Sequence, residues 1–385
     1  MKVCAVTTWP PHHDGVALYS AELYNEAANL VDVEVVANGS PQQDKHGRSK
    51  TKEGNVVGYW RRGILYPLRV FHSVFKTGCN VVHLQHGWLL YGGQVSSLLF
   101  PVLLCFFRLS RKPCVVTMHT VIRGNAKIYS NFLVNFLSRV AVSWVTMGTV
   151  NFSDKVIVHN QLMKNVLQKE YLAKEEKVVI ISHGVKQSSN KTEALHDNKM
   201  YILSLGFLRK EKRIECLLEA FKKVVDRFPN TELVIVGGSH AHDKSDYSEE
   251  IKRNITAELM KQVEFTGFVD DKTLEQLIGR SNIVVLQSTE SYYVEASGTL
   301  AAVANYGKAV VCSRVPKFQS ELQNGKNCIF VEPSNSTELA QALVLLMEDK
   351  ELRKRLGDNL KERFKNRNWG AAAKQHILVY RSVVR

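Results

Sequence analysis

Residues 200–238 read MYILSLGFLRKEKRIECLLEAFKKVVDRFPNTELVIVGG, and this stretch decides the fold class. YILSLG and ELVIVGG are short apolar runs that end in glycine, as buried parallel strands do. Between them, apolar residues recur at spacings of three and four, which predicts one amphipathic helix. A strand, a helix and a second strand in this order form a unit of a parallel sheet. The residues of the apolar stripe are Ile214, Leu217, Leu218, Phe221, Val224, Val225 and Phe228.

The same alternation continues along the whole chain. The first half contains VCAVTT, VEVVA, VVHLQH, CVVTMHT, KVIVH and VVIIS, and the second adds VEFTGF, NIVVLQS, AVVCS and CIFVEP. We therefore expect an α/β protein with two Rossmann-like, doubly wound parallel-sheet domains. Loops and helix N-termini gather at the carboxyl edge of each sheet, so two facing edges would grip a ligand across a cleft.

Polar stretches and the C-terminal pattern suggest the domain boundaries. Residues 186–199 (KQSSNKTEALHDNK) have almost nothing to bury, and residues 40–55 are expected to form a surface loop. We expect domains at residues 1–185 and 186–365. The nearly continuous helical pattern after Thr337 breaks near 368–370, and we expect a last helix, 366–385, that packs back on the first domain.

Composition narrows the class of protein. The 385 residues are 45% hydrophobic and 23% charged, which is ordinary for a globular chain. The seven cysteines are scattered without a Cys-x-x-Cys pair, which indicates buried thiols in a reducing compartment and argues against a disulfide framework or a zinc site. The opening MKVCAVTTWPP leads directly into a strand-like run, so we expect a cytoplasmic protein without a signal peptide.

The net charge of +14 is unevenly distributed. Residues 54–153 contain no Asp or Glu, and they also hold the most apolar run, LLFPVLLCFF at 98–107, and the aromatic, basic segment WRRGILYPLRVF at 60–71. Basic, aromatic and apolar residues together suit a surface that rests on anionic lipid. The alternative is a buried apolar helix flanked by solvated cations. Nucleic acid is not expected as a partner, because no recognition-helix, zinc-finger or RNP-like pattern is present.

Two segments of the second half favour the binding of an anion. No G-x-G-x-x-G follows the first strand, and there is no P-loop signature. Instead, GFLRKEKR (206–213) places Arg209, Lys210, Lys212 and Arg213 between a strand and the N-terminus of a helix, where cations repel the helix dipole unless an anion is present. In TESYYVEASGTL (289–300), Ser297, Gly298 and Thr299 would present backbone N–H groups at the start of a helix from about 300 to 306.

The chain resembles the family 4 retaining glycosyltransferases of the GT-B fold over essentially its full length. The resemblance rests on G-x-x-R-x-x-K at 206–212, YGKAVV at 306–311, NCIFVEP at 327–333 and the ending NWGAAAKQHILVY at 368–380. In the first half, PPHHDGVALYSAEL resembles the glycine loop that approaches the donor, and VVTMHT resembles the strand that ends in an active-site histidine.

The resemblance implies the following roles for these residues. Arg209 and Lys212 would bind the diphosphate of a GDP- or UDP-linked sugar, which is a substrate, and no cofactor is implied. Ser297, Gly298 and Thr299 would add backbone amides, and Gly15 would let the first loop approach closely. His119 would hydrogen-bond the transferred sugar. Glu295 would hold a sugar hydroxyl, with Glu290 as the rival for that role.

One position departs from the family pattern. The second carboxylate of the family's Glu-x₇-Glu pattern, which holds the nucleotide ribose, falls on Ala302, and the preceding loop is longer by about two residues. The chain is nearer to a subgroup with Ser-Gly before the donor-site helix.

The resemblance implies a metal-independent reaction, and the sequence contains no Asp-x-Asp motif. A glycan or lipid-linked molecule would be the acceptor. Two alternatives are a catalytically silent GT-B binding protein and another GT-B enzyme, such as a nucleotide-sugar epimerase.

Overall fold

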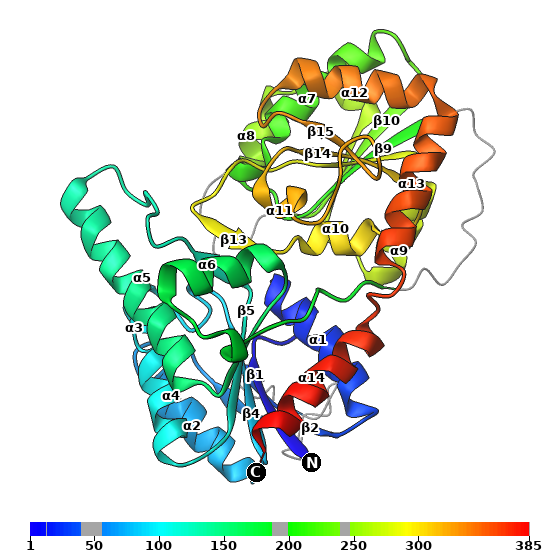
Figure 1. Ribbon diagram of the computed structural model, residues 1–385. Coiled ribbons are helices and arrows are strands. Elements are labelled where there is room, and N and C mark those ends of the chain that lie inside the picture. Colours follow the sequence, from blue (N-terminus) through cyan, green and yellow to red (C-terminus); the bar gives the residue numbers. More distant parts are fainter. Residues whose placement is uncertain (13, 40–55, 187–198, 239–246, 385) are drawn as a thin grey trace, which may run out of the picture. The chain divides into compact units, whose positions relative to one another are not determined.

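The structure is a computed structural model that describes residues 1–12, 14–39, 56–186, 199–238 and 247–384. The chain divides into two compact units (Figure 1). Unit 1 comprises Met1–Gly184, Ser291–Ala296 and Trp369–Arg385, and unit 2 comprises Val185–Glu290 and Ser297–Asn368. The loop predicted at 40–55 and residues 187–198 of the predicted linker lie outside the described residues.

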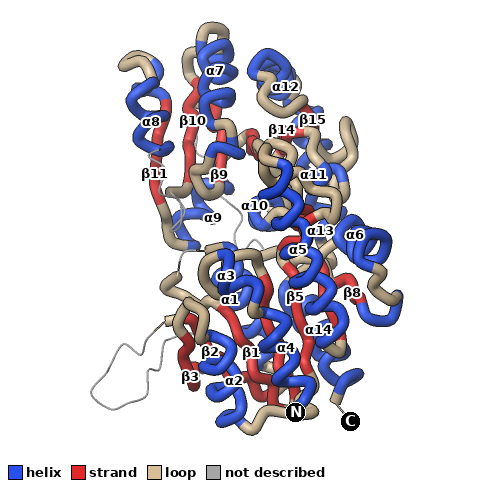
Figure 2. The backbone as a smooth tube through the Cα atoms, turned by 90° about the vertical axis from the view of Figure 1, so that its left-hand side faces the viewer, coloured by secondary structure: helices blue, strands red, loops and turns tan. Residues whose placement is uncertain are grey.

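Within its described residues, unit 1 is built on a seven-stranded parallel sheet in the order β3-β2-β1-β4-β5-β7-β8 (Figure 2). The central strands β1, β4 and β5 are buried almost throughout, which is why they appear in the sequence as continuous apolar runs. The strands are β1 Lys2–Thr7, β2 Asp32–Asn38, β3 Val56–Trp60, β4 Val81–His86, β5 Cys114–Met118, β7 Lys155–Val158 and β8 Val178–Ile180.

Helices cover both faces of this sheet and bury two apolar clusters. On one face, side chains from α2 Tyr66–Thr77, α4 Phe100–Leu109, α5 Phe132–Phe152 and α6 Gln161–Tyr171 share one cluster. On the other face, α1 Gly15–Ala28 packs beside α14 Trp369–Val383. The short helix α3 Gln94–Leu98 precedes α4. The apolar run 98–107 therefore forms a core helix, since Phe100, Leu103, Leu104 and Phe107 of α4 are buried.

Two parts of unit 1 come from distant positions in the sequence. The division predicted at residue 185 assigned 291–296 to the second domain. The structure instead places them in unit 1, because β13 Tyr293–Glu295 pairs antiparallel with β6 Thr120–Ile122. The last helix, α14, also belongs to unit 1, where the Trp369 ring packs on Gly184 and on the Tyr19 ring.

The described part of unit 2 holds a six-stranded parallel sheet in the order β11-β10-β9-β12-β14-β15. Helix α7 Ile214–Val225 confirms the predicted apolar stripe, which ends at the partly buried Phe228. The strands are β9 Met200–Leu205, β10 Thr231–Val236, β11 Val263–Gly267, β12 Ile283–Leu286, β14 Ala309–Ser313 and β15 Ile329–Val331. The other helices are α8 Tyr247–Asn254, α9 Asp271–Arg280, α10 Gly298–Val303, α11 Pro316–Gln319, α12 Ser336–Glu348 and α13 Lys350–Phe364.

Candidate functional site

The predicted donor loop of unit 2 begins where β9 ends. Gly206 has a φ of 129°, a backbone conformation that suits glycine, and a Cβ at this position would lie 3.1 Å from Thr299 Cγ2. The same Cβ would lie 3.8 Å from Lys212 Nζ. Lys212 and Thr299, 87 positions apart in the sequence, therefore both pack against Gly206. The fold brings the two predicted anion-binding segments together, as the carboxyl edge of a parallel sheet does.

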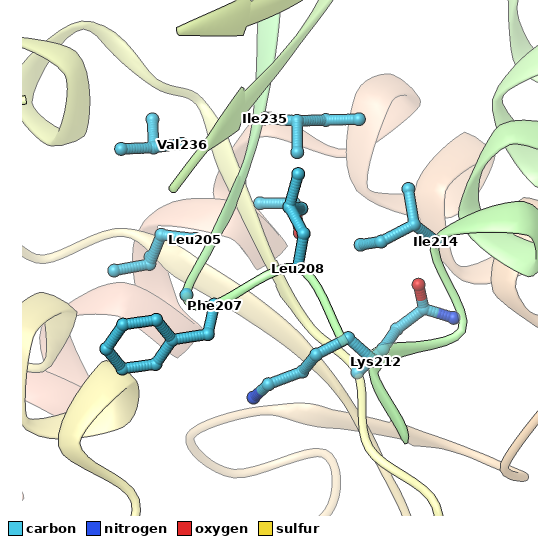
Figure 3. Close-up of a pocket in the computed structure, with 10 residues that line it drawn as sticks. Leu205, Phe207, Leu208, Lys212, Ile214, Ile235 and Val236 are labelled. Atoms are coloured by element: carbon cyan, nitrogen blue, oxygen red, sulfur yellow. The ribbon is translucent and has the colours of Figure 1, made fainter. Parts of the chain in front are cut away.

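Lys212 borders a small cavity below this loop. Figure 3 shows its side chain extended along the loop, with the ammonium on the side of Phe207 and away from Ile214. Gln287, which follows β12, also lines the cavity and is 5% exposed. Its Oε1 has no hydrogen-bond partner among the described residues, and a buried acceptor of this kind is costly unless a donor reaches it. The cavity therefore presents a cation and an unsatisfied acceptor beside the loop.

Two other cations of the loop, Arg209 and Arg213, are held by neighbouring side chains. Arg213 Nη1 lies 3.1 Å from Glu215 Oε1, and its Nε donates to Ser334 Oγ at 3.0 Å. Arg209 Nε lies 3.6 Å from Glu211 Oε2. The carboxylates of Glu211 and Glu215 therefore offset part of the repulsion between these cations and the helix dipole, which the sequence pattern assigned to an anion alone.

Ser297, Gly298 and Thr299 form the N-terminus of α10. The Ser297 hydroxyl accepts from Leu300 N at 3.2 Å and lies 3.0 Å from Thr299 Oγ1, so the helix begins two residues before the predicted position. As the first helical residues, Gly298 and Thr299 have backbone N–H groups without a carbonyl partner inside the helix. Ala302, where the family pattern has a carboxylate, lies half-buried on α10.

The two rival carboxylates belong to different units. Glu290 is exposed in unit 2, directly after Thr289, whose N–H donates to Glu211 O of the donor loop at 2.9 Å. Glu295 lies in unit 1, where it is paired with Thr120 in the register of β13 and β6. Asn160 Nδ2 also donates to Glu295 O at 3.2 Å. Glu295 therefore lies in the same unit as His119, in a strand paired with Thr120, the residue after His119.

His119 follows β5 and is half-buried among other rings. Its Nε2 lies 2.8 Å from Gln85 Oε1, its Nδ1 lies 3.4 Å from His159 Nε2, and its ring packs edge-on against Tyr19 at 4.7 Å between centroids. The Ile181 carbonyl fixes the His159 proton on Nδ1, so His159 presents its lone pair to His119. Burial lowers the pKa of His119 well below its usual range, and the nearby histidines lower it further. At neutral pH, His119 is thus neutral and carries one N–H, which either Gln85 Oε1 or His159 Nε2 can accept.

Sequence reasoning missed the neighbours of His119. His86 ends β4, His159 directly follows β7 and His183 follows β8, so four strands that are neighbours in the order β4-β5-β7-β8 end at or near a histidine. Burial lowers the pKa of His159 to about 3 and that of His86 to about 4. The signal was present in the strands VVHLQH, VVTMH, KVIVH and VVIISH, but only one of them matched a known motif.

Gly15 is the first residue of α1. Asp14 caps this helix by accepting from Ala17 N at 2.8 Å, and it also accepts from Thr8 Oγ1 at 2.9 Å, which holds the loop after β1. Gly15 is exposed, and apart from its chain neighbours and its own helix backbone, no atom of the described residues lies within 4 Å of the position that a Cβ would occupy. The open space at this loop is what a close approach by a ligand requires.

Comparisons with known proteins match both halves of the chain. The model of Glycosyltransferase Family 4 matches residues 13–188, and that of Glycosyl transferases group 1 matches residues 185–363. Each half of the chain thus matches a glycosyltransferase family model, and together the two matches support a glycosyltransferase of the family 4, GT-B type. The predicted fold class is thereby confirmed, with two parallel-sheet α/β units and a last helix that returns to the first.

Individual proteins match this chain at low sequence identity. An uncharacterized glycosyltransferase of Methanocaldococcus jannaschii is 27% identical over 244 residues, which is 60% of each chain. The phosphatidyl-myo-inositol mannosyltransferase of Mycolicibacterium smegmatis is 28% identical over 185 residues, 47% of this chain and 45% of that protein. The chain thus spans about 60% or less of the length of these curated relatives. Among solved structures, Anabaena HepE in complex with UDP-glucose matches with a TM-score of 0.75 and 17% identity, over 99% of this chain and 100% of that chain.

Proposed function

We propose that the protein is a retaining glycosyltransferase that moves a hexose from a GDP- or UDP-linked sugar to a hydroxyl of a lipid-linked or other glycan. In this proposal it needs no metal and works as a peripheral enzyme at the cytoplasmic face of a membrane. The observation that carries the proposal is the convergence of Lys212 and Thr299 on Gly206 in unit 2.

This convergence suits a diphosphate. The Lys212 ammonium and the N–H groups at the start of α10 are preorganised donors, and such donors stabilise negative charge that develops during a reaction. Arg209 would contribute a second cation after exchanging its Glu211 contact for the ligand. A neutral ligand would gain little from this loop, because it would not offset the repulsion between the cations.

The sugar would be held by residues of unit 1. His119 lies at the carboxyl edge of the sheet, one residue from the ladder that carries Glu295, and in this proposal both bind sugar hydroxyls, His119 after giving up its contact with Gln85 or His159. In this role Glu295 takes precedence over Glu290, which lies beside the cations of the donor loop in unit 2.

The proposed reaction needs no covalent nucleophile. The bond between the anomeric carbon and the β-phosphate oxygen breaks, and its electron pair leaves with the nucleoside diphosphate. The acceptor oxygen bonds to the anomeric carbon on the same face and passes its proton to the leaving phosphate. The protein supplies orientation and electrostatic stabilisation.

The relatives support the choice of substrates. HepE was crystallised with UDP-glucose, which favours a nucleotide-sugar donor for a chain of the same fold. The mycobacterial relative is named for phosphatidyl-myo-inositol, which favours an acceptor attached to a lipid.

The test is incubation of the full chain with a panel of radiolabelled GDP- and UDP-sugars, after a thermal-shift screen that selects the nucleotides that bind. A ligand at 100 times its Kd stabilises the folded state by about 2.7 kcal/mol, which is readily measured. Release of nucleoside diphosphate or transfer of label supports the proposal. Binding without turnover under all conditions would favour a silent GT-B binding protein, and interconversion of the sugar itself would favour an epimerase.

A further inference from the structure

Helix α5 carries an exposed apolar stripe that the proposed reaction does not use. Seven large apolar side chains, all between 42% and 85% exposed, recur at spacings of one, three and four residues. At 3.6 residues per turn they cover about 140° of the helix circumference and run along about 22 Å of its axis. These residues are Phe132, Leu133, Phe136, Leu137, Val140, Trp144 and Met147.

The opposite side of α5 is fixed in unit 1. Val142, Val145, Gly148 and Thr149 are buried there, and a Cβ on Gly148 would lie 2.6 Å from Pro101 Cβ of α4. By length and composition, α5 is the one helix among the described residues that could cross a membrane. Its packing against α4 rules out that role, because a spanning helix would have to leave the core of the unit.

The exposed stripe is preformed. Asn131 caps α5 by accepting from Val134 N at 3.1 Å, and Asn135 accepts from Ile128 N at 2.7 Å and Tyr129 N at 3.1 Å. Arg139 Nε donates to Gly124 O at 2.7 Å. The polar side chains therefore hold the preceding loop, and Figure 1 shows the start of α5 lying away from the sheet of its unit. Contiguous exposed apolar surface of this kind marks an interaction site.

The charges around α5 indicate what kind of partner binds the exposed stripe. The 100 residues from 54 to 153 include α5 and contain no carboxylate, while Lys127 lies in the loop before α5 and Arg139 on the helix. Arg123 of the same loop is paired with Glu170 of α6 at 3.7 Å. An exposed apolar helix face with nearby cations, and with aromatics such as Tyr129 and Trp144, fits the pattern of an amphipathic helix that lies in the interface of an anionic bilayer. Pairing of two copies through this stripe would bring like charges together without complementary carboxylates on α5.

We propose that α5 docks unit 1 on an anionic membrane by lying in the interface of one leaflet, with the stripe from Phe132 to Met147 among the acyl chains. This proposal rests on the membrane association in the proposed function and names the surface that makes the contact. It does not depend on sugar transfer. It assigns the contact to α5 in place of the segments at 60–71 and 98–107 that the sequence suggested. In those segments Trp60, Tyr66 and Val70 are buried, as is half of α4, and the exposed Ile64, Leu65 and Leu68 make a shorter apolar patch than the stripe of α5.

The experiment is sedimentation of the full chain with vesicles of phosphatidylcholine alone or with about one third phosphatidylglycerol, at about 0.1 M and about 0.5 M salt. We expect binding to the anionic vesicles that weakens at high salt. The test variant combines Phe132→Gln, Phe136→Gln and Leu137→Gln, which keep a helix-forming residue at each position. Since each buried side chain of this size contributes more than a factor of ten, we expect at least about a 100-fold loss of binding.

A matched variant combines Ile64→Gln, Leu65→Gln and Leu68→Gln, three apolar residues of unit 1 with exposures of 62%, 52% and 56%. It should bind within a few-fold of the native chain. Equal binding by the α5 variant, or loss only in the matched variant, would overturn the assignment to α5. So would light scattering that shows a lipid-free dimer which the α5 variant abolishes.

Both variants should keep the native thermal shift with nucleotides and the native rate with a soluble acceptor. A native chain that binds vesicles but turns over no nucleotide sugar would refute the transfer reaction and leave the docking of α5 intact. A native chain that turns over donor and stays in the supernatant with every vesicle would refute the docking alone.

Discussion

The cations of residues 209–213 differ in what surrounds them. Arg213 is tied to Glu215 and Ser334, whereas Lys212 extends past Gly206 beside Thr299 and lines a cavity with Gln287. Cations that look equivalent in the sequence thus differ in their surroundings, and we propose that Arg213 packs the loop while Lys212 contacts the ligand.

We expect Lys212→Ala and Arg209→Ala each to lower turnover by about 10²-fold or more, the scale of removing one preorganised contact to a developing charge. The matched control is Arg213→Asn, because Arg213 has a φ of 48° and asparagine tolerates this conformation. This control should stay within a few-fold of the native rate. Steady-state kinetics and thermal unfolding provide the measurements, and all three variants should unfold close to the native temperature. Near-native turnover in Lys212→Ala would refute the diphosphate site.

At the scale of elements, the return of α14 to unit 1 depends on a contact at a glycine. A Cβ on Gly184 would lie 2.2 Å from Cδ2 of Trp369, and the Trp369 ring also packs against His183 and Tyr19 at 5.1 Å between centroids. The chain end and the strand-end histidines therefore form one packed region.

We expect Gly184→Ala to destabilise unit 1 by about 1–3 kcal/mol, the usual cost of overpacking, measured by denaturant unfolding. Gly15→Ala is the control for stability, because nothing lies within 4 Å of its Cβ position. It should unfold like the native chain and still lower turnover, since the added methyl group enters the space proposed for the donor. If Gly184→Ala leaves stability unchanged, Trp369 does not pack as described.

At the scale of the whole molecule, histidines divide unevenly between the units. The described part of unit 2 contains none, whereas unit 1 buries His83, His86, His159 and His376. Burial lowers the pKa of His159 to about 3 and those of His86 and His376 to about 4. The two units should therefore respond differently to acid.

We expect unit 1 to lose stability before unit 2 as the pH falls. A buried histidine with a lowered pKa stays neutral in the folded state, while in the unfolded chain it takes up a proton below about pH 6.5. The unfolding free energy is therefore highest above pH 6.5. For each of these histidines it falls by about 1.4 kcal/mol per pH unit, down to about pH 4 for His86 and His376 and about pH 3 for His159. Hydrogen exchange at pH 7 and pH 5, corrected for intrinsic rates, should show lost protection in unit 1 peptides. Equal losses in both units would contradict this.

We also expect full turnover in excess EDTA. In the proposed site, Lys212 and Arg209 would supply the positive charge that a metal would otherwise bring to the diphosphate. Initial rates with EDTA and with added magnesium or manganese are the measurement. A rate that collapses with EDTA and returns with either metal would mean that the charge on the leaving group is stabilised in another way.

Local patterns were enough to predict the architecture. The apolar stripe of α7, the glycine after β9 and the apolar runs of the strands are properties of residues close together in sequence, and they predict helices, strands and a parallel sheet without tertiary information. The segments around Lys212 and Thr299 could be expected to meet, because the carboxyl edge of a parallel sheet is defined by topology alone.

The tertiary structure was needed to separate residues and segments that look alike in the sequence. Glu295 falls in the same unit as His119 because a three-residue strand pairs with β6, far away in the sequence, while Glu290 lies in the other unit. The run 98–107 is core and the stripe of α5 is exposed, although both are strongly apolar, because burial depends on what packs against a helix and not on its composition. The sequence alone therefore determined the fold class and the candidate donor loop. Contacts between distant residues decided the carboxylate, the row of histidines and the exposed face.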